Sequence, residues 1–325
     1  MALTIVRFKQ ADGEPGWGVL YGDRVARLSG DYASTGDLIE HGLAEASALT
    51  PARADLQLET LELLAPVTAN QQFLCQGLNY RCHVRESGMD PDKIPFNTLF
   101  TKAPSCIMAA RGDIARPGHV RLLDYEVELG VVLRRRIDGP VAIHEANLHE
   151  YAAALTLVND ISARDVQLPQ TQFYKGKSYR GFGPVGPYLV FPTPEEWRRL
   201  GELRLRLAVN GELRQDSYCR EMIYQPAQTL TELAGMHDLF PGDLLATGTP
   251  AGCAAVAPKS KVLTWALRAL MSERRKWALF LKAQQGNRRY LRPGDAMVAS
   301  IRTDDCRLDL GEQHHRIVAA QGAAP

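Results

Sequence analysis

Residues 124–133 read DYEVELGVVL, an apolar strand-like run that begins with an acidic residue at every second position. Side chains of a strand alternate between its two faces, so Asp124, Glu126 and Glu128 share one face at intervals of about 7 Å. If that face is buried, the carboxylates repel one another unless a cation or hydrogen-bond donors compensate them. Hard oxygen ligands at this spacing suit Mg²⁺, Mn²⁺ or Ca²⁺, whereas an edge strand with a solvated acidic face explains the pattern equally well.

A second apolar run also ends in an acidic residue. AALTLVND (153–160) closes on Asp160, and the chain continues as ISARDVQ. The Asp160 carboxylate could cap a helix that starts in ISARDVQ, but that role would use only part of its lone pairs. The pattern therefore favours a metal site formed by Glu126, Glu128 and Asp160.

Strand-like runs bounded by glycine, proline and aspartate recur along most of the chain, and few long helical patterns separate them. This texture favours an α+β, mostly β architecture with short helices and disfavours a doubly wound parallel sheet. We expect a small β-rich N-terminal domain over residues 1–65 and a larger catalytic domain over residues 66–325. Residues 254–289 contain good helix formers and nine lysines or arginines against one glutamate, which predicts a basic helical insertion.

The composition is that of an ordinary globular protein, with 45% hydrophobic and 23% charged residues among 325. The formal net charge of +1 gives no general attraction to nucleic acid, and no apolar run reaches the ~18 residues of a membrane span. The six cysteines form no C-x-x-C pair, and the N-terminus lacks the apolar core of a secretory signal. We therefore expect a cytoplasmic protein with reduced thiols.

The segment NYRCHVRESG (79–88) predicts a two-turn helix, with Asn79 as its N-cap and Gly88 as the left-handed residue at its end. His83 and Glu86 are three residues apart and share a face of this helix. A carboxylate beside an imidazole raises its basicity, as the activation of water requires. The alternative is a surface pair without a catalytic role. An H-x-x-E spacing considered alone favours this alternative.

Seven motifs, in their order along the chain, resemble those of the fumarylacetoacetate hydrolase family: GLNYRCHVRESG, FTKAPSCI, DYEVELGVVL, VNDISARDVQ, YKGKSYRGFGPVGP, VNGELRQDS and PGDLLATGTPAG. The resemblance covers residues 70–253 and resumes over residues 291–301. It implies a mixed β-roll, usually a homodimer, often preceded by a small β-rich domain. It also implies that Glu126, Glu128 and Asp160 bind Mg²⁺ or Mn²⁺.

The same resemblance implies roles for residues around the metal. His83 and Glu86 match the water-activating dyad of the family's hydrolases, and Lys177 matches a lysine at the active site. Gln167, Lys177 and Thr249 match residues that line the family's substrate pocket. We also expect Tyr80 and Arg180 to bind substrate.

Three departures from the family pattern affect these expectations. Some relatives carry a fourth carboxylate ligand where this chain has Gln76, so water would complete the coordination of the metal. Many relatives carry aspartate at the position of Arg180, which suggests a second anionic or bulkier end on the substrate. The insertion 254–289 follows the T-G-T-P loop directly, and we interpret it first as a peripheral helical hairpin. A lid is the second interpretation, and contact with a membrane surface or carrier protein is the third.

We therefore expect a metal-dependent hydrolase that cleaves a carbon–carbon bond in an acylpyruvate-like 1,3-dicarbonyl acid. His83, oriented by Glu86, would activate the water, and Lys177 would hold substrate oxygens. The same site could serve an isomerase, tautomerase, hydratase or decarboxylase acting on a 2-oxo or 2-hydroxy-dienoic acid. A metal-binding scaffold is the non-enzymatic alternative, and buried acids argue against it because their burial is costly.

Overall fold

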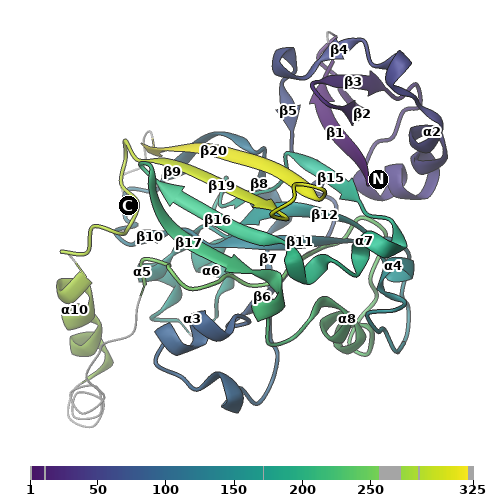
Figure 1. The fold of residues 1–325 in the computed structure, drawn as a ribbon. Coiled ribbons are helices and arrows are strands. Elements are labelled where there is room, and N and C mark those ends of the chain that lie inside the picture. Colours follow the sequence, from purple (N-terminus) through teal and green to yellow (C-terminus); the bar gives the residue numbers. More distant parts are fainter. Residues whose placement is uncertain (1, 11, 171, 256–271, 285, 321–325) are drawn as a thin grey trace.

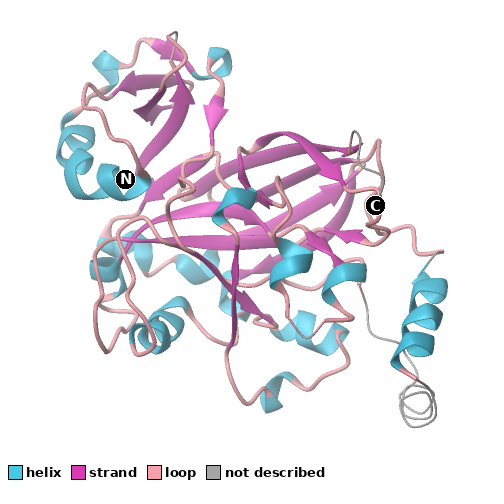
Figure 2. Ribbon diagram, turned by 180° about the vertical axis from the view of Figure 1, so that it is seen from behind, coloured by secondary structure: helices cyan, strands magenta, loops and turns pink. Residues whose placement is uncertain are grey.

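The computed structural model describes residues 2–320 apart from residues 11, 171, 256–271 and 285. Two β-sheets pack face to face, and short helices surround them (Figures 1 and 2). The α+β, mostly β fold and the mixed β-roll expected from the sequence are confirmed. A doubly wound parallel sheet is absent from the described chain, because most of its strand pairs are antiparallel.

The larger sheet has eleven strands within the described residues. In spatial order they are β4 (Leu56–Gln57), β3 (Arg24–Arg27), β2 (Pro15–Tyr21), β1 (Leu3–Lys9), β15 (Tyr188–Phe191), β12 (Ala152–Asn159), β11 (Val127–Leu133), β18 (Leu244–Ala246), β6 (Phe73–Gly77) and β7 (Thr98–Lys102), with β5 (Leu63–Leu64) paired to β1. The β1–β15 pair joins the N-terminal strands to this sheet. Strands β11 and β12 lie at its centre, antiparallel, with Glu128 opposite Val158.

The second sheet has five described strands, in the order β17 (Glu212–Tyr218), β16 (Arg204–Val209), β19 (Ala296–Arg302), β20 (Asp309–Ala319) and β9 (Arg111–Arg116). Two short pairs complete the strands, β10 (Leu123–Asp124) with β13 (Ser162–Ala163) and β8 (Ile107–Met108) with β14 (Gly183–Pro184).

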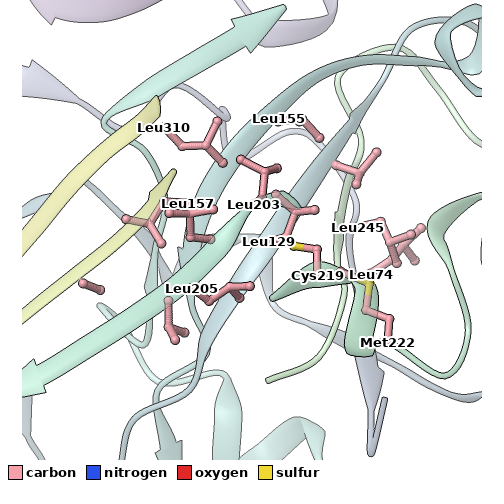
Figure 3. Packing of buried hydrophobic residues seen from close by; sticks show 14 of the residues in the cluster. Leu74, Leu129, Leu155, Leu157, Leu203, Leu205, Cys219, Met222, Leu245 and Leu310 are labelled. Carbon is pink, nitrogen blue, oxygen red and sulfur yellow. The ribbon is translucent and has the colours of Figure 1, made fainter. Parts of the chain in front are cut away.

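The main hydrophobic core lies between the two sheets. Leucines of β11 and β12 meet leucines of the second sheet there, among them Leu129, Leu157, Leu205 and Leu310 (Figure 3). Both central strands are buried along their whole length, as expected for apolar runs covered on both faces. Because Leu129 points into this core, the alternation of the strand places Glu128 on the opposite face.

The α-helices are short and lie around the sheets. They are α1 (Thr35–Asp37), α2 (Leu43–Ala48), α3 (Arg81–Glu86), α4 (Leu148–Tyr151), α5 (Arg164–Gln167), α6 (Tyr174–Lys177), α7 (Pro194–Trp197), α8 (Pro226–Ala234) and α10 (Glu273–Gln284). A π-helical turn, η1 (Leu38–Gly42), joins α1 to α2. Single 3₁₀ turns occur at η2 (Pro51–Arg53), η3 (Leu58–Thr60), η4 (Pro91–Lys93), η5 (Pro104–Cys106), η6 (Leu200–Glu202) and η7 (Cys219–Glu221).

The helix predicted for residues 79–88 is confirmed as α3, and Gly88 has the positive φ of +79° expected after a helix end. The prediction of Asn79 as its N-cap is wrong. The extended residue before the first turn is Tyr80. The Asn79 side chain instead donates to the backbone oxygens of Thr247 and Tyr224 at 2.8 and 3.0 Å, which ties the T-G-T-P loop to this helix.

The predicted helical insertion is confirmed over its described part, where α10 is a twelve-residue helix. The part of the prediction that falls on residues 256–271 lies outside the described residues. Among the described helices, none combines the length and apolarity that crossing a bilayer requires.

Candidate metal centre and active site

The three carboxylates predicted to bind metal lie together. Glu128 belongs to β11, Glu126 precedes that strand, and Asp160 directly follows β12. The backbone N–H of Asp160 donates to the carbonyl oxygen of Glu126 at 2.8 Å, which aligns the two strand ends. One oxygen of each carboxylate lies within 4.8 Å of the others, and all three side chains are buried. A solvated acidic face is therefore wrong, and so is Asp160 as a helix cap, because Ala163 holds the N-cap position of α5.

Three buried cations surround these carboxylates. Arg164 of α5 pairs with Asp124 through Nε at 2.8 Å and with Glu126 through its terminal nitrogen. Lys177, at the end of α6, pairs with Glu126 at 2.7 Å and with Asp160. Lys102, at the end of β7, pairs with Asp160. It also donates to the carbonyl oxygen of Phe182 at 2.7 Å. Lys102 was not predicted as a site residue, although a lysine that ends the strand-like run TLFTK is a signal for one.

Glu128 is the exception, because no cation pairs with it among the described residues. Its carboxylate accepts one hydrogen bond, from the backbone N–H of Gly248 at 2.9 Å, where the chain turns at a φ of +83°. Burial raises the Glu128 pKa well above its usual range, and the negative charges of Asp160 and Glu126 add to this effect. Burial also opposes the ionisation of Glu126, but Arg164 and Lys177 outweigh it and lower the pKa of that carboxyl.

The charge balance and the donor atoms both fit a hard divalent cation. Four buried carboxylates, including Asp124, meet three buried cations, which leaves the negative charge of Glu128 without a counterpart. Carboxylate oxygens are the ligands that Mg²⁺ and Mn²⁺ prefer. Gln76 lines the same cavity, and its buried Oε1 has no hydrogen-bond partner in the described chain. A cation held by Glu126, Glu128 and Asp160 would compensate the unpaired charge.

His83 lies beside this centre. One of its ring nitrogens lies within 4.8 Å of a carboxylate oxygen of Glu126, and its Nδ1 is buried with no partner among the described residues. Burial lowers the His83 pKa, so the ring is neutral at pH 7. Glu86 shares α3 with it, but Glu86 Oε2 accepts from the backbone N–H of Gly252 at 2.8 Å. No hydrogen bond joins His83 to Glu86 in the described structure.

A cavity of about 360 Å³ is lined by His83 and by two of the three carboxylates, Glu126 and Glu128. Its lining includes three of the positions expected to bind substrate, Gln167, Lys177 and Thr249. Gln167 Oε1 accepts from Arg164 at 2.8 Å, and the Thr249 hydroxyl donates to the carbonyl oxygen of Val127 at 3.0 Å, so both side chains are fixed.

Gly176 allows the helix that carries Lys177 to lie close to the helix that carries Gln167. A Cβ on Gly176 would lie 2.6 Å from the Cβ of Gln167, so only glycine lets α6 pack this closely on α5. The other two positions expected to bind substrate lie apart from the cavity. Tyr80 is fully buried, with its hydroxyl 3.9 Å from the sulfur of Cys219, and Arg180 is exposed.

The lining also contains apolar residues that the sequence did not single out. They are Leu78, Phe100, Leu168, Phe173, Ala255 and Phe280. The last two belong to the ends of the basic insertion. Cys253, buried within 4.8 Å of both His83 and Glu126, lies behind the lining.

Comparison with protein families gives two matches that together span most of the chain. Residues 72–318 match the family described as fumarylacetoacetate (FAA) hydrolase C-terminal. Residues 4–66 match the family described as Rv2993c-like, N-terminal.

Individual proteins of similar sequence extend over about two thirds of the chain. The oxaloacetate tautomerase FAHD2B, mitochondrial, of Bos taurus is 33% identical over 222 residues, which is 66% of this chain and 68% of that protein. A putative hydrolase of Burkholderia multivorans is 37% identical over 230 residues, 70% of this chain and 77% of that protein.

Solved structures resemble the whole chain. A probable 2-hydroxyhepta-2,4-diene-1,7-dioate isomerase from Mycobacterium abscessus is 28% identical with a TM-score of 0.71, over 99% of this chain and all of that one. A fumarylacetoacetate hydrolase from Exiguobacterium antarcticum is 26% identical with a TM-score of 0.68, over 98% of this chain and all of that one.

Proposed function

The chain belongs to the fumarylacetoacetate hydrolase family, and we propose that it is a metal-dependent tautomerase or isomerase that moves a proton on a small 2-oxo acid. The observation that carries the proposal is the position of His83 beside the three buried carboxylates and at the wall of a small cavity, where burial lowers its pKa. A neutral imidazole accepts a proton without first losing one, as a general base must. The names of the bovine relative, a tautomerase, and of the M. abscessus structure, a probable isomerase, support this choice.

Each residue of the site would contribute in its own way. Glu126, Glu128 and Asp160 would hold Mg²⁺ or Mn²⁺, which when bound would polarise the 2-oxo group and favour the enolate. His83 would take the proton from the carbon next to the 2-oxo group and deliver it to the 2-oxo oxygen to give the enol. In the reverse direction it would take the enol proton and return it to that carbon. Lys177, buried between two carboxylates, would present its remaining N–H to a substrate oxygen.

Hydrolysis of a carbon–carbon bond is the second candidate, and one observation favours it. The buried His83 Nδ1 lacks a partner in the described structure, and Glu86 lies one turn further along the same helix. A rotation of the Glu86 side chain away from Gly252 could supply that partner and form the water-activating dyad. Proton transfer ranks first because it needs only the arrangement that is present.

One assay separates the two functions. The enol form of an acylpyruvate is mixed with the protein in Mg²⁺ or in EDTA, its absorbance is followed, and the products are identified by NMR. We expect metal-dependent loss of the enol with the carbon skeleton intact. Release of pyruvate and a second acid would establish the hydrolase instead, and no reaction of any 2-oxo acid would overturn the proposal in favour of a metal-binding scaffold.

Variants of two histidines complete the experiment. Replacing His83 with alanine should abolish turnover and leave Mn²⁺ binding intact, because His83 is not among the proposed ligands. The control is His314→Ala on β20, whose side chain is 46% exposed on the second sheet, and it should keep full activity. Activity that survived in the His83 variant would show that another group moves the proton.

Three further expectations accompany the proposed function. Mg²⁺ or Mn²⁺ is the metal, a homodimer is the active state, and the cytoplasm is the location. Sedimentation analysis tests the homodimer, and a mass near that of one chain would contradict it.

A further inference from the structure

The lining of the cavity has a charged part and an apolar part. The charged part includes Glu126, Glu128 and His83, and the apolar part includes Phe100, Leu168, Phe173 and Phe280. The rings of Phe100 and Phe173 meet edge to face with their centroids 5.2 Å apart, which gives this wall a defined shape.

Beside these apolar residues, the described lining contains no cation without a carboxylate partner. Among the described lining residues, the cations are Arg164 and Lys177, and each is already paired with two carboxylates. Arg180, the residue that could have met a second anionic group, is exposed and does not line the cavity. A carboxylate at the far end of a ligand would therefore lose its hydration without gaining a partner in the described wall.

Phe280 comes from α10, the helix of the basic insertion, which lies at the edge of the molecule (Figure 1). Its ring is partly buried, packs against the main core, and stacks on Trp277 with a centroid distance of 5.0 Å. Within the described lining, the insertion rather than the β-roll supplies Phe280 and the small side chain of Ala255.

Hydrogen bonds fasten both ends of the insertion to the metal centre. The Asp124 carboxylate accepts from the backbone N–H groups of Ala254 and Ala255 at 2.8 and 3.0 Å. On the returning side, Asn287 donates to the carbonyl oxygen of Ala254 at 2.9 Å, and Arg289 donates to that of Gly252 at 2.6 Å. Asp124 also pairs with Arg164, so the segment that carries Phe280 is tied to the network that holds the carboxylates.

We propose that Phe280 is a specificity-determining residue that completes the apolar part of the cavity lining and selects a 2-oxo acid ending in an alkyl or aryl group over one ending in a second carboxylate. The inference rests on the proposed function and narrows its substrate class. Each methylene buried against the wall should improve kcat/KM roughly fourfold. An unpaired carboxylate in the same place should lower it on the order of a hundredfold.

The test compares two acylpyruvate series of equal length, one with alkyl or phenyl ends and the other with carboxylate ends. The wild-type protein should prefer the apolar series by about the hundredfold given above, and Phe280→Lys should shift this ratio at least tenfold toward the carboxylate series. Phe280→Leu keeps the wall apolar but shortens it, so it should still reject carboxylates while accepting larger apolar ends. The matched controls are Leu279→Lys and Leu279→Ala, since Leu279 is 43% exposed on the same helix and does not line the cavity.

Two outcomes would overturn the inference. Equal kcat/KM for both series is one, and an equal shift in the Phe280→Lys and Leu279→Lys proteins is the other. Circular dichroism checks that the variants keep their helix content. If Phe280→Lys loses it, the decision rests on Phe280→Leu, whose acceptance of larger apolar ends must differ from that of Leu279→Ala.

A binding measurement separates failure of this inference from failure of the proposed function. Dissociation constants of both series are measured calorimetrically in Mn²⁺ with the His83→Ala protein. Selective binding that Phe280→Lys reverses, without turnover in the wild type, would retain the inference and remove the proposed function. Turnover by the wild type without selective binding of either series would retain the proposed function and remove the inference.

Discussion

Replacing Glu128 with glutamine should have opposite effects in the absence and the presence of metal. Glu128 is 1% exposed, and its hydrogen-bond donor in the described structure is the backbone N–H of Gly248. Glutamine keeps the shape and an oxygen that can accept this bond, so the change removes little besides the charge. Without metal, the loss of an unpaired buried charge should stabilise the protein by about 1–3 kcal/mol.

The size of this effect should depend on pH. Because the Glu128 pKa is raised in the folded state, the folded protein binds more protons than the unfolded one above the ordinary value of 4.5. The contribution of Glu128 to stability is therefore present below pH 4.5 and is lost as pH rises toward the folded-state pKa. The Glu128→Gln protein does not lose stability in this way. The amount by which it is more stable than the wild type should therefore be small near pH 4.5 and should grow at higher pH.

Metal should reverse the order of stability. A cation that binds only the folded wild-type protein stabilises it by about 2.7 kcal/mol at a hundred times its Kd. Glu128→Gln removes one of three charged ligands, so it should lose most of this gain and become the less stable protein in Mn²⁺. At about 2 °C for each kcal/mol, both differences are measurable by scanning calorimetry.

The measurement compares melting temperatures in EDTA and in MnCl₂ at several pH values, with calorimetric titration of Mn²⁺. Glu59→Gln is the control, because Glu59 is exposed in η3 and its loss of charge should change little. Unchanged Mn²⁺ affinity in the Glu128 variant would refute the assignment of this ligand. A lower melting temperature in EDTA would refute the claim that its charge is uncompensated.

Three further predictions follow from other buried groups. Lys102→Met leaves one of the two cations on Asp160 and should lower the free energy of unfolding by about 3 kcal/mol in urea, with a loss below 1 kcal/mol counting against the pairing. Because burial lowers the His83 pKa, the acid limb of kcat/KM should fall below pH 6.5, and a limb above that value would contradict a neutral base. Burial lowers the pKa of His315 to about 4, so the unfolded state binds the extra proton between pH 6.5 and 4, and stability should fall by about 3 kcal/mol as pH drops through this range. His315→Gln should flatten that slope in urea titrations, and an unchanged slope would exclude His315 as its source.

Local sequence was sufficient for the strands and for the carboxylates on them. The period of two in DYEVELGVVL places Glu126 and Glu128 on one face, and the end of the next apolar run supplies Asp160 beside them. Both features depend on neighbouring residues within one strand, and the antiparallel pairing of β11 with β12 then brings them together. The same local reasoning found α3 but placed its N-cap one residue too early.

Side chains that reach the site from distant segments could not be predicted in this way. Lys102 meets Asp160 across 58 positions of sequence, and nothing near Lys102 indicates that partner. The orientation of Glu86 is another case, because the backbone of Gly252, 166 positions away, competes for its carboxylate. Such contacts depend on how elements pack, and a pattern along one segment carries no information about that packing.

The charged and the apolar parts of the cavity lining therefore differ in how far local sequence predicts them. The charged part is encoded by motifs at the ends of the central strands β11 and β12, where neighbouring residues along the chain supply the carboxylates. The apolar part combines Phe100 and Phe173 of the β-roll with Phe280 of the insertion, and a change in any of these can alter the ligand without altering the metal site. On the proposed function, the motifs of the charged part would determine the chemistry that a 2-oxo acid undergoes, whereas the apolar part would determine which 2-oxo acid binds.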